Sequence, residues 1–240
     1  MKRILAGLAD LIFPPRCIAC EKILIDEEHH SFCCDCYDRI GFVRSPVCTQ
    51  CGIPFAGKEQ EDHPCGECLT GKPVFTAARC VGRYEEPLLS CIHQFKYNAN
   101  IGAGRRLGKL MAQYEYPAFR ISDYSLIIPI PLHLKRLRER GFNQSLILAK
   151  EIAKQHHLPV DFMNLKRQVY TKPQVNLGKD ERQANVRGAF KAVDAGRING
   201  EKIILVDDVY TTGSTVRECA TVLMKAGAQD VAVLTLARAV

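Results

Sequence analysis

Hydrophobic residues beyond residue 76 occur in two alternating patterns. Continuous apolar runs predict buried strands, because a strand covered on both faces is apolar throughout, and these fall at 125–131, 202–209 and 230–237, while 78–84 also has the character of a strand. Helical spacing predicts helices at 87–97, 105–114, 143–157 and 214–226. The last helix is followed by Gly227, a residue type that commonly closes helices. Strands alternating with helices predict an α/β fold with a mostly parallel, doubly wound sheet.

The first 76 residues lack this alternation, so we expect two domains, 1–76 and 77–240. The apolar start at 4–13 contains Asp10 and runs into Pro14-Pro15, without the small-residue cleavage site of a signal peptide. It predicts a short amphipathic helix. No run approaches the ~18 apolar residues of a membrane span. We therefore expect a cytoplasmic protein.

Charge divides the chain in the same way. The 240 residues are 47% hydrophobic and 25% charged, as in soluble globular proteins, with a net charge of +7. Residues 1–76 carry 8 basic and 11 acidic residues, whereas 77–240 carry 25 and 15. The segment 133–191 alone has 13 basic and 5 acidic residues. This imbalance fits phosphorylated or polyanionic partners, although a solvated basic face would have the same composition.

Nine of the 12 cysteines fall in the first 68 residues. Eight form CxxC pairs, a spacing that lets one turn direct both sulfurs at one metal ion. They are Cys17, Cys20, Cys33, Cys36, Cys48, Cys51, Cys65 and Cys68. Eight thiols predict two zinc ions, and shells of four thiolates are closed, so both zinc ions are expected to be structural. Disulfides are the alternative, which a reducing cytosol opposes.

Several details of the metal module stay open at this point. The pairs can combine sequentially or as an interleaved cross-brace, and Cys34 could replace Cys33. Gly52 and Gly66 follow cysteines where a turn favours positive φ. The remaining cysteines are expected to be buried packing thiols and three histidines to be surface residues, namely Cys80, Cys91, Cys219, His29, His30 and His63.

The segment 203–215 carries the clearest candidate chemistry. An apolar strand ends in two carboxylates, a Thr/Gly/Ser loop follows, and a helix begins within that loop. Helix N-termini bind phosphate, and ligands of parallel sheets bind at the carboxyl ends of strands. Adjacent acids suit ribose hydroxyls and a bridging Mg²⁺. The segment therefore predicts a phosphorylated sugar bound with Mg²⁺ by Asp207, Asp208, Thr211, Thr212, Gly213, Ser214 and Thr215.

This segment resembles the 5-phosphoribosyl-1-pyrophosphate (PRPP) motif of type I phosphoribosyltransferases. Other motifs, together with the CxxC series, resemble the ComF family over nearly the whole chain. They are Pro131-Leu132-His133, Arg136 to Gln144 (RLRERGFNQ), Phe95-Lys96-Tyr97, Thr171 with Gln174, and Arg182 with Asn185 and Phe190. The resemblance implies zinc fingers joined to a phosphoribosyltransferase-like fold, and a role in competence, the uptake of single-stranded DNA.

The resemblance also implies residue roles. Asp207 and Asp208 would hold the PRPP ribose and Mg²⁺, and residues 211–215 the 5′-phosphate. The loop after Pro131 would bind pyrophosphate or DNA through Arg136, Arg138 and Arg140, for which a solvated helix start is the alternative. For Asn143 and Gln144 the alternative is that they cap the next helix instead of contacting ligand. Lys96 is a further candidate, and a lysine extending from a helix end is the alternative.

Two function classes compete. One is a PRPP-binding competence protein that contacts single-stranded DNA, with a competence helicase or other uptake proteins as partners. The other is an active phosphoribosyltransferase in nucleotide or related metabolism, for which no residue identifies a catalytic base or an acceptor.

Overall fold

A computed structural model describes residues 14–24, 31–57, 61–97, 100–170 and 184–240. Its centre is a four-stranded sheet in the order β1-β6-β5-β2, and every neighbouring pair is parallel. The strands are β1 (Ala77–Arg83), β2 (Leu126–Pro129), β5 (Lys202–Tyr210) and β6 (Asp230–Arg238). All four were predicted as strands, three of them from apolar runs, and burial on both faces explains those runs.

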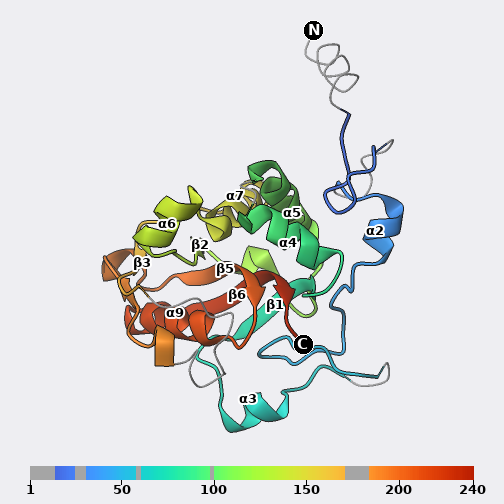
Figure 1. The fold of residues 1–240 in the computed structure, drawn as a ribbon. Coiled ribbons are helices and arrows are strands. Elements are labelled where there is room, and N and C mark those ends of the chain that lie inside the picture. The colour runs from blue at the N-terminus through green and yellow to red at the C-terminus, as the bar shows by residue number, and fades with distance from the viewer. Residues whose placement is uncertain (1–13, 25–30, 58–60, 98–99, 171–183) are drawn as a thin grey trace.

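Helices cover both faces of this sheet (Figure 1). On one face a core cluster joins α4 (Leu88–Tyr97), α5 (Ile101–Gln113) and α7 (Gln144–His156) to the sheet. On the other face α9 (Ser214–Lys225) packs with a short antiparallel pair, β3 (Leu165–Arg167) and β4 (Phe190–Ala192). The phosphoribosyltransferase-like, doubly wound architecture predicted from the sequence is confirmed.

The structure departs from the predicted elements in its short segments. The loop expected after Pro131 is largely a helix, α6 (Leu134–Arg140), which has no buried residue and therefore no apolar pattern. The cysteine-rich part contains α2 (Cys34–Asp38) and α3 (Gly66–Thr70). Gly66 is the first residue of α3, so the positive φ expected there is wrong. Gly52 does have positive φ, at 71°. Two 3₁₀ turns complete the set, at Ile121–Asp123 and Ala195–Arg197.

The cysteine-rich segment runs along the outer edge of β1 (Figure 1). Val43 N–H donates to Val81 O at 2.9 Å, and Ala78 N–H donates to Gln50 O at 2.6 Å. Phe42 forms an antiparallel bridge with Gly82. Backbone groups of an exposed edge strand would otherwise pair with another chain. The segment thus completes the sheet edge as well as carrying the cysteines.

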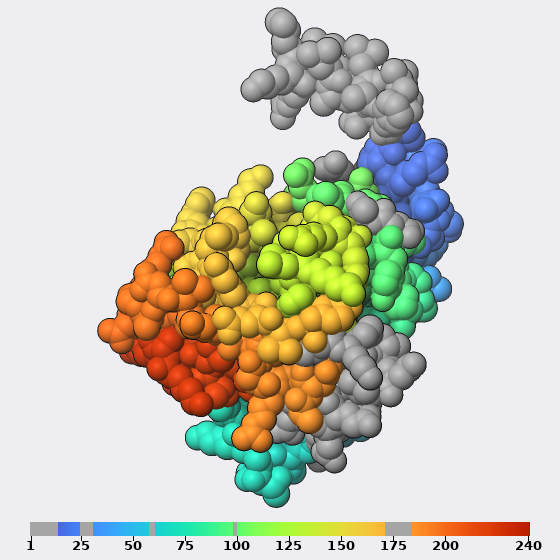
Figure 2. All heavy atoms as spheres, turned by 60° about the vertical axis from the view of Figure 1, so that its left-hand side comes forward, coloured from blue at the N-terminus to red at the C-terminus, as the bar shows by residue number. Residues whose placement is uncertain are grey.

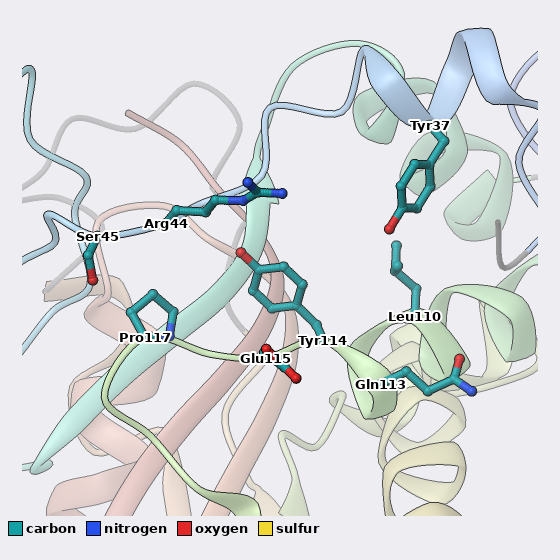
Figure 3. Close-up of a pocket in the computed structure, with 8 residues that line it drawn as sticks. All are labelled: Tyr37, Arg44, Ser45, Leu110, Gln113, Tyr114, Glu115 and Pro117. Atoms are coloured by element: carbon teal, nitrogen blue, oxygen red, sulfur yellow. The ribbon is translucent and has the colours of Figure 1, made fainter. Parts of the chain in front are cut away.

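A cavity of about 370 Å³ lies where the cysteine-rich segment meets the end of α5. Figure 3 shows Tyr37 extending from α2 toward Leu110, and Arg44 beside Tyr114. The Tyr114 hydroxyl donates to Val43 O at 2.5 Å, and this hydrogen bond connects the end of α5 to the cysteine-rich segment just after α2. The cavity is a feature of this junction.

None of the described helices has the length and apolar character that a membrane crossing requires. The helix predicted at 4–13, together with His29, His30, Thr171, Gln174 and Arg182, lies outside the described residues. His63 is exposed, as expected, and stacks on Phe55 with ring centroids 4.1 Å apart. Cys80, Cys91 and Cys219 are buried packing thiols, also as expected.

Candidate functional site

The eight CxxC cysteines form two groups, and each group is made of successive pairs. Cys17, Cys20, Cys33 and Cys36 bring their sulfur atoms within 4.8 Å of one another, as do Cys48, Cys51, Cys65 and Cys68. The sequential pairing is the one that the structure adopts. Cys34 is exposed and outside the first group, so Cys33 is the member with matching geometry.

Sulfur separations in both groups fit zinc. Cys20 Sγ lies 3.6 Å from Cys33 Sγ, and Cys51 Sγ lies 3.7 Å from Cys65 Sγ. A zinc ion bound tetrahedrally at about 2.3 Å from each sulfur sets neighbouring sulfurs roughly 3.8 Å apart, whereas a disulfide would need about 2 Å. Two structural zinc ions therefore fit the residues present.

Backbone donors favour the thiolate form that zinc binds. Cys48 Sγ accepts from Cys51 N–H at 3.4 Å and from Cys65 N–H at 3.2 Å. Burial alone would raise the pKa of Cys48, but these N–H groups outweigh it and lower the pKa to about 6. Burial is outweighed in the same way at Cys17, whose pKa is lowered to about 7. In each group, then, one cysteine gives up its proton more readily than a free cysteine does.

The two adjacent acids lie at the carboxyl end of β5, as predicted. Asp207 accepts a hydrogen bond from the Ser145 hydroxyl, at the start of α7, over 2.9 Å. Burial and the charge of Asp208 raise the pKa of Asp207 to about 7. Ser145 was not singled out from the sequence, because it lies 62 positions from Asp207.

Lys96 meets the acid pair from the last turn of α4. Its Nζ lies 2.9 Å from Asp208 Oδ2, and the two side chains are 18% and 12% exposed. Burial would lower the pKa of Lys96, but the attraction of Asp208 outweighs burial and raises it. Of the four basic candidates, Lys96 is the one that forms an ion pair with the predicted acids in the described part of the chain.

The Thr/Gly/Ser loop joins β5 to α9. Gly213 has φ 76° and precedes the first residue of α9, and its carbonyl accepts the first helical bond, from Arg217 N–H at 2.9 Å. The Thr212 and Ser214 hydroxyls lie 2.8 Å apart. A Cβ on Gly213 would lie 2.2 Å from the Tyr210 hydroxyl, so only glycine fits between Tyr210 and the surface of the loop. α9 thus begins behind a glycine and without a side-chain cap, and helix N-termini in general attract anions.

The three arginines after Pro131 lie on α6, where Arg136 and Arg140 are four positions apart and share a face, and Arg138 lies on the other face. Arg138 is exposed, whereas Arg140 packs over the Tyr97 ring at 5.8 Å. Arg136 lies near Arg167, since burial and then the charge of Arg136 lower the pKa of Arg167. Asn143 caps α7 and accepts from Ser145 N–H at 3.1 Å, so the capping interpretation holds for Asn143.

Exposed aromatic residues accompany these basic side chains. Tyr97 is 68% exposed and Tyr170 is 42% exposed, and Lys135 Nζ lies 4.7 Å above the Tyr170 ring. Segments around α6 form the middle of the face in Figure 2. Phe142 instead packs on Phe95 in the core, with ring centroids 5.6 Å apart. Tyr97 belongs to the Phe95-Lys96-Tyr97 motif. The sequence did not show that Tyr97 is exposed whereas Phe95 is buried, and only the structure distinguishes the two.

Comparison with known proteins supports the two halves separately. Residues 8–69 match the double zinc ribbon domain, and residues 143–239 match the phosphoribosyl transferase domain. The first match covers both cysteine groups. The second covers β5, the loop and α9.

The relatives that match over most of the chain are named for competence or for DNA utilization. The chain is 32% identical over 228 residues to competence protein F of Haemophilus influenzae, covering 93% of this chain and 97% of that protein. It is 32% identical over 231 residues to the DNA utilization protein YhgH of Salmonella typhimurium, covering 95% and 99%. It is 27% identical over 217 residues to competence protein ComFC of Bacillus subtilis, covering 86% and 83%.

Proposed function

The chain belongs to the ComF family, with competence protein F and YhgH, and we propose that it binds Mg²⁺ and PRPP at the β5–α9 loop while it handles single-stranded DNA. A competence-related role follows from the family. The binding of PRPP, Mg²⁺ and single-stranded DNA is what we propose in addition. We place it in the cytoplasm, where eight thiolates can hold zinc without oxidation, and we treat 1–76 and 77–240 as its two domains.

The observation that carries the donor site is the acid pair followed by the open helix start. Asp207 and Asp208 end β5, and α9 begins at Ser214 behind Gly213. Carboxylates bind ribose hydroxyls and Mg²⁺, and repel a bare phosphate. The N–H groups at the start of α9 attract an anion. Only a ligand with a diol at one end and a phosphate at the other satisfies both halves.

Lys96 holds the acid pair ready for that ligand. Its ammonium group neutralises Asp208 at 2.9 Å, so the two carboxylates do not stand as uncompensated charges in a half-buried site. Mg²⁺ supplies positive charge when it binds with the diphosphate. Lys96 can then turn to the diphosphate oxygens, which a flexible four-carbon stem allows.

The single-stranded DNA surface is proposed for the face around α6. Basic side chains there would contact phosphates, and exposed Tyr97 and Tyr170 would stack with bases. A basic side chain lies beside each of these rings, Arg140 over Tyr97 and Lys135 over Tyr170, so phosphate and base contacts would be adjacent. A competence helicase or another uptake protein is the partner that would deliver or receive this strand.

An active phosphoribosyltransferase is the second candidate, favoured by the neighbouring acid pair and lysine beside the loop. Transfer forms a bond between C1 of the ribose and an acceptor atom and releases pyrophosphate with both bonding electrons. The protein mainly needs to position the donor and stabilise charge. Release of pyrophosphate from PRPP that depends on an added acceptor would establish this activity.

Calorimetry on the zinc-loaded full chain tests the proposal. PRPP should bind with Mg²⁺ and much more weakly without it. A single-stranded oligonucleotide should then bind the same sample, with affinity falling as salt rises by about 0.7 in the log–log slope per phosphate contact. PRPP binding that ignores Mg²⁺ would contradict the donor site, and salt-independent or absent DNA binding would contradict the DNA surface.

A further inference from the structure

The second cysteine group is in direct contact with a side chain from the end of the sheet. Arg238, near the carboxyl end of β6, donates through Nη1 to Cys51 O at 2.6 Å, and its Nη2 lies 3.6 Å from Cys51 Sγ. Arg238 is 7% exposed. A guanidinium in this position binds the cysteine carbonyl and sulfur together, and a zinc-bound thiolate is the negative partner that its charge requires.

Arg238 also packs on the residue that supports the phosphate loop. Its Cζ lies 4.3 Å above the ring of Tyr210, the last residue of β5 and 3% exposed. A cation held against an aromatic face away from water is an attractive contact. Tyr210 and Arg238 are also neighbours in the parallel register of β5 and β6. Both their backbones and side chains are therefore fixed relative to each other.

Tyr210 in turn lies directly beneath Gly213. The Tyr210 hydroxyl occupies the space where a Cβ of Gly213 would lie, 2.2 Å from that position. Gly213 holds φ 76° and leads into α9. The hydroxyl therefore limits how closely the loop can approach the sheet, and so helps to set the position of the N–H groups that would bind phosphate. Cys51, Arg238, Tyr210 and Gly213 make one continuous series of buried contacts.

We propose that Arg238 and Tyr210 are positioning residues that couple the second zinc site to the phosphate loop, so that zinc at Cys48, Cys51, Cys65 and Cys68 strengthens phosphate binding at 211–215. The inference rests on the proposed donor site. With zinc bound, Cys51 holds Arg238, and Arg238 holds the Tyr210 ring under the loop. Without zinc, Cys51 no longer has a fixed place, and the support under Gly213 loosens. Coupling of this kind is reciprocal, so phosphate also strengthens zinc binding.

The first cysteine group supplies a matched control. Arg39 Nη2 lies 3.8 Å from Cys36 Sγ, which is the same guanidinium–sulfur contact. Arg39 follows α2 and, within the described residues, makes no hydrogen bond, ion pair or ring contact with β5, the loop or α9. Arg39→Gln and Arg238→Gln therefore remove the same kind of contact from two zinc sites, and only one of these sites is joined to the loop.

The test titrates inorganic phosphate into the parent chain, Arg238→Gln and Arg39→Gln, each carrying two zinc ions by elemental analysis. Arg238→Gln should weaken phosphate binding at least about fivefold, the lower end of typical coupling. Arg39→Gln should bind as the parent does, and Arg238→Lys should recover only part of the loss because it cannot hold two groups and stack at once. Equal affinity in the parent and Arg238→Gln would overturn the coupling. A parent that binds no phosphate would overturn the donor site itself.

A second measurement needs no variant and so does not depend on whether Arg238→Gln folds. Chelator competition on the parent chain gives the affinities of both zinc ions, with and without saturating phosphate. The proposal requires phosphate to raise the affinity of one of them, the zinc of the second group, by the factor by which that zinc raises phosphate affinity. Unchanged affinities for both zinc ions would overturn it.

Discussion

The two cysteine groups differ in burial at one member. Each group has two buried outer cysteines and one partly exposed cysteine, but Cys51 of the second group is buried whereas Cys20 of the first group is exposed. The parts of the protein that contact the two cysteine groups differ more than the cysteines themselves do. Arg238 and Arg79, from β6 and β1, both bind the second group's segment. The first group instead contacts helices, through Cys91 Sγ to Ile18 O at 3.5 Å and an arginine of α5.

The comparison shows that one motif repeated in a chain can serve two purposes. The first group orders its own segment beside α4 and α5. The second group is packed against β1 and β6, and β6 lies beside β5, the strand that leads to the candidate donor site, so its stability is part of the stability of that site. Predictions that separate the two groups therefore test the account better than those that treat them alike.

Loss of zinc should have the largest effect, and an unequal one. A structural zinc contributes about 10–16 kcal/mol of apparent binding free energy that is also folding free energy. Cys20→Ser should leave one zinc per chain and a folded α/β part, whereas Cys51→Ser should also lower the thermal midpoint of the α/β part. Elemental analysis with thermal denaturation by circular dichroism checks both.

Cys34→Ser is the control for the cysteine variants, because Cys34 is exposed and outside both groups. It should keep two zinc ions and the parent midpoint. Loss of a zinc from Cys34→Ser, or equal destabilisation by Cys20→Ser and Cys51→Ser, would contradict the difference between the groups.

Replacing the arginines that bind the segments of the two cysteine groups should give a smaller difference in the free energy of unfolding. Arg79 is 4% exposed and donates to Pro117 O at 2.6 Å and Thr49 O at 3.1 Å. Arg106 donates to Arg16 O at 2.9 Å in an exposed setting. Arg79→Gln should lower the free energy of unfolding by roughly 3 kcal/mol, and Arg106→Gln by less than about 1 kcal/mol. Urea denaturation measures both, and an equal loss in the two variants would count against the account.

The smallest expected difference in stability is between two glycine replacements, both within the segment of the second cysteine group. Gly52 has φ 71°, and a Cβ there would lie 2.2 Å from Ala78 O of β1. Gly52→Ala should cost about 1–3 kcal/mol through backbone strain and separation from the sheet. A Cβ on Gly66 meets nothing within 4 Å, so Gly66→Ala in α3 should be neutral or stabilise by up to about 1 kcal/mol. Melting curves that rank these two variants in the opposite order would show that the segment is not packed on β1.

The sequence predicted what depends on local pattern. Buried strands carry apolar runs, so β2, β5 and β6 could be located, β1 was also recognisable as a strand, and CxxC spacing located both cysteine groups. The adjacent acids and the glycine at residue 213 are also local. These features carry most of the fold class and the candidate phosphate loop.

Features that depend on tertiary contacts could not be predicted. Lys96 and Asp208 form an ion pair across more than a hundred positions, and Arg238 reaches Cys51 across 187 positions. No spacing rule connects such residues. α6 was missed as a helix for another reason: none of its residues is buried, so hydrophobic periodicity cannot report it.

The central claim is that Asp207 and Asp208 hold a ribose diol with Mg²⁺ while the loop holds phosphate. Calorimetry of PRPP with Mg²⁺ on the parent and on the Asp207→Ala, Asp208→Ala double variant tests this most directly. Each lost contact to a charged group is worth roughly 1.5–3 kcal/mol, or one to two decades of affinity. The account predicts that the double variant loses Mg²⁺-dependent PRPP binding but still binds inorganic phosphate at the loop. PRPP binding as tight as in the parent would contradict it.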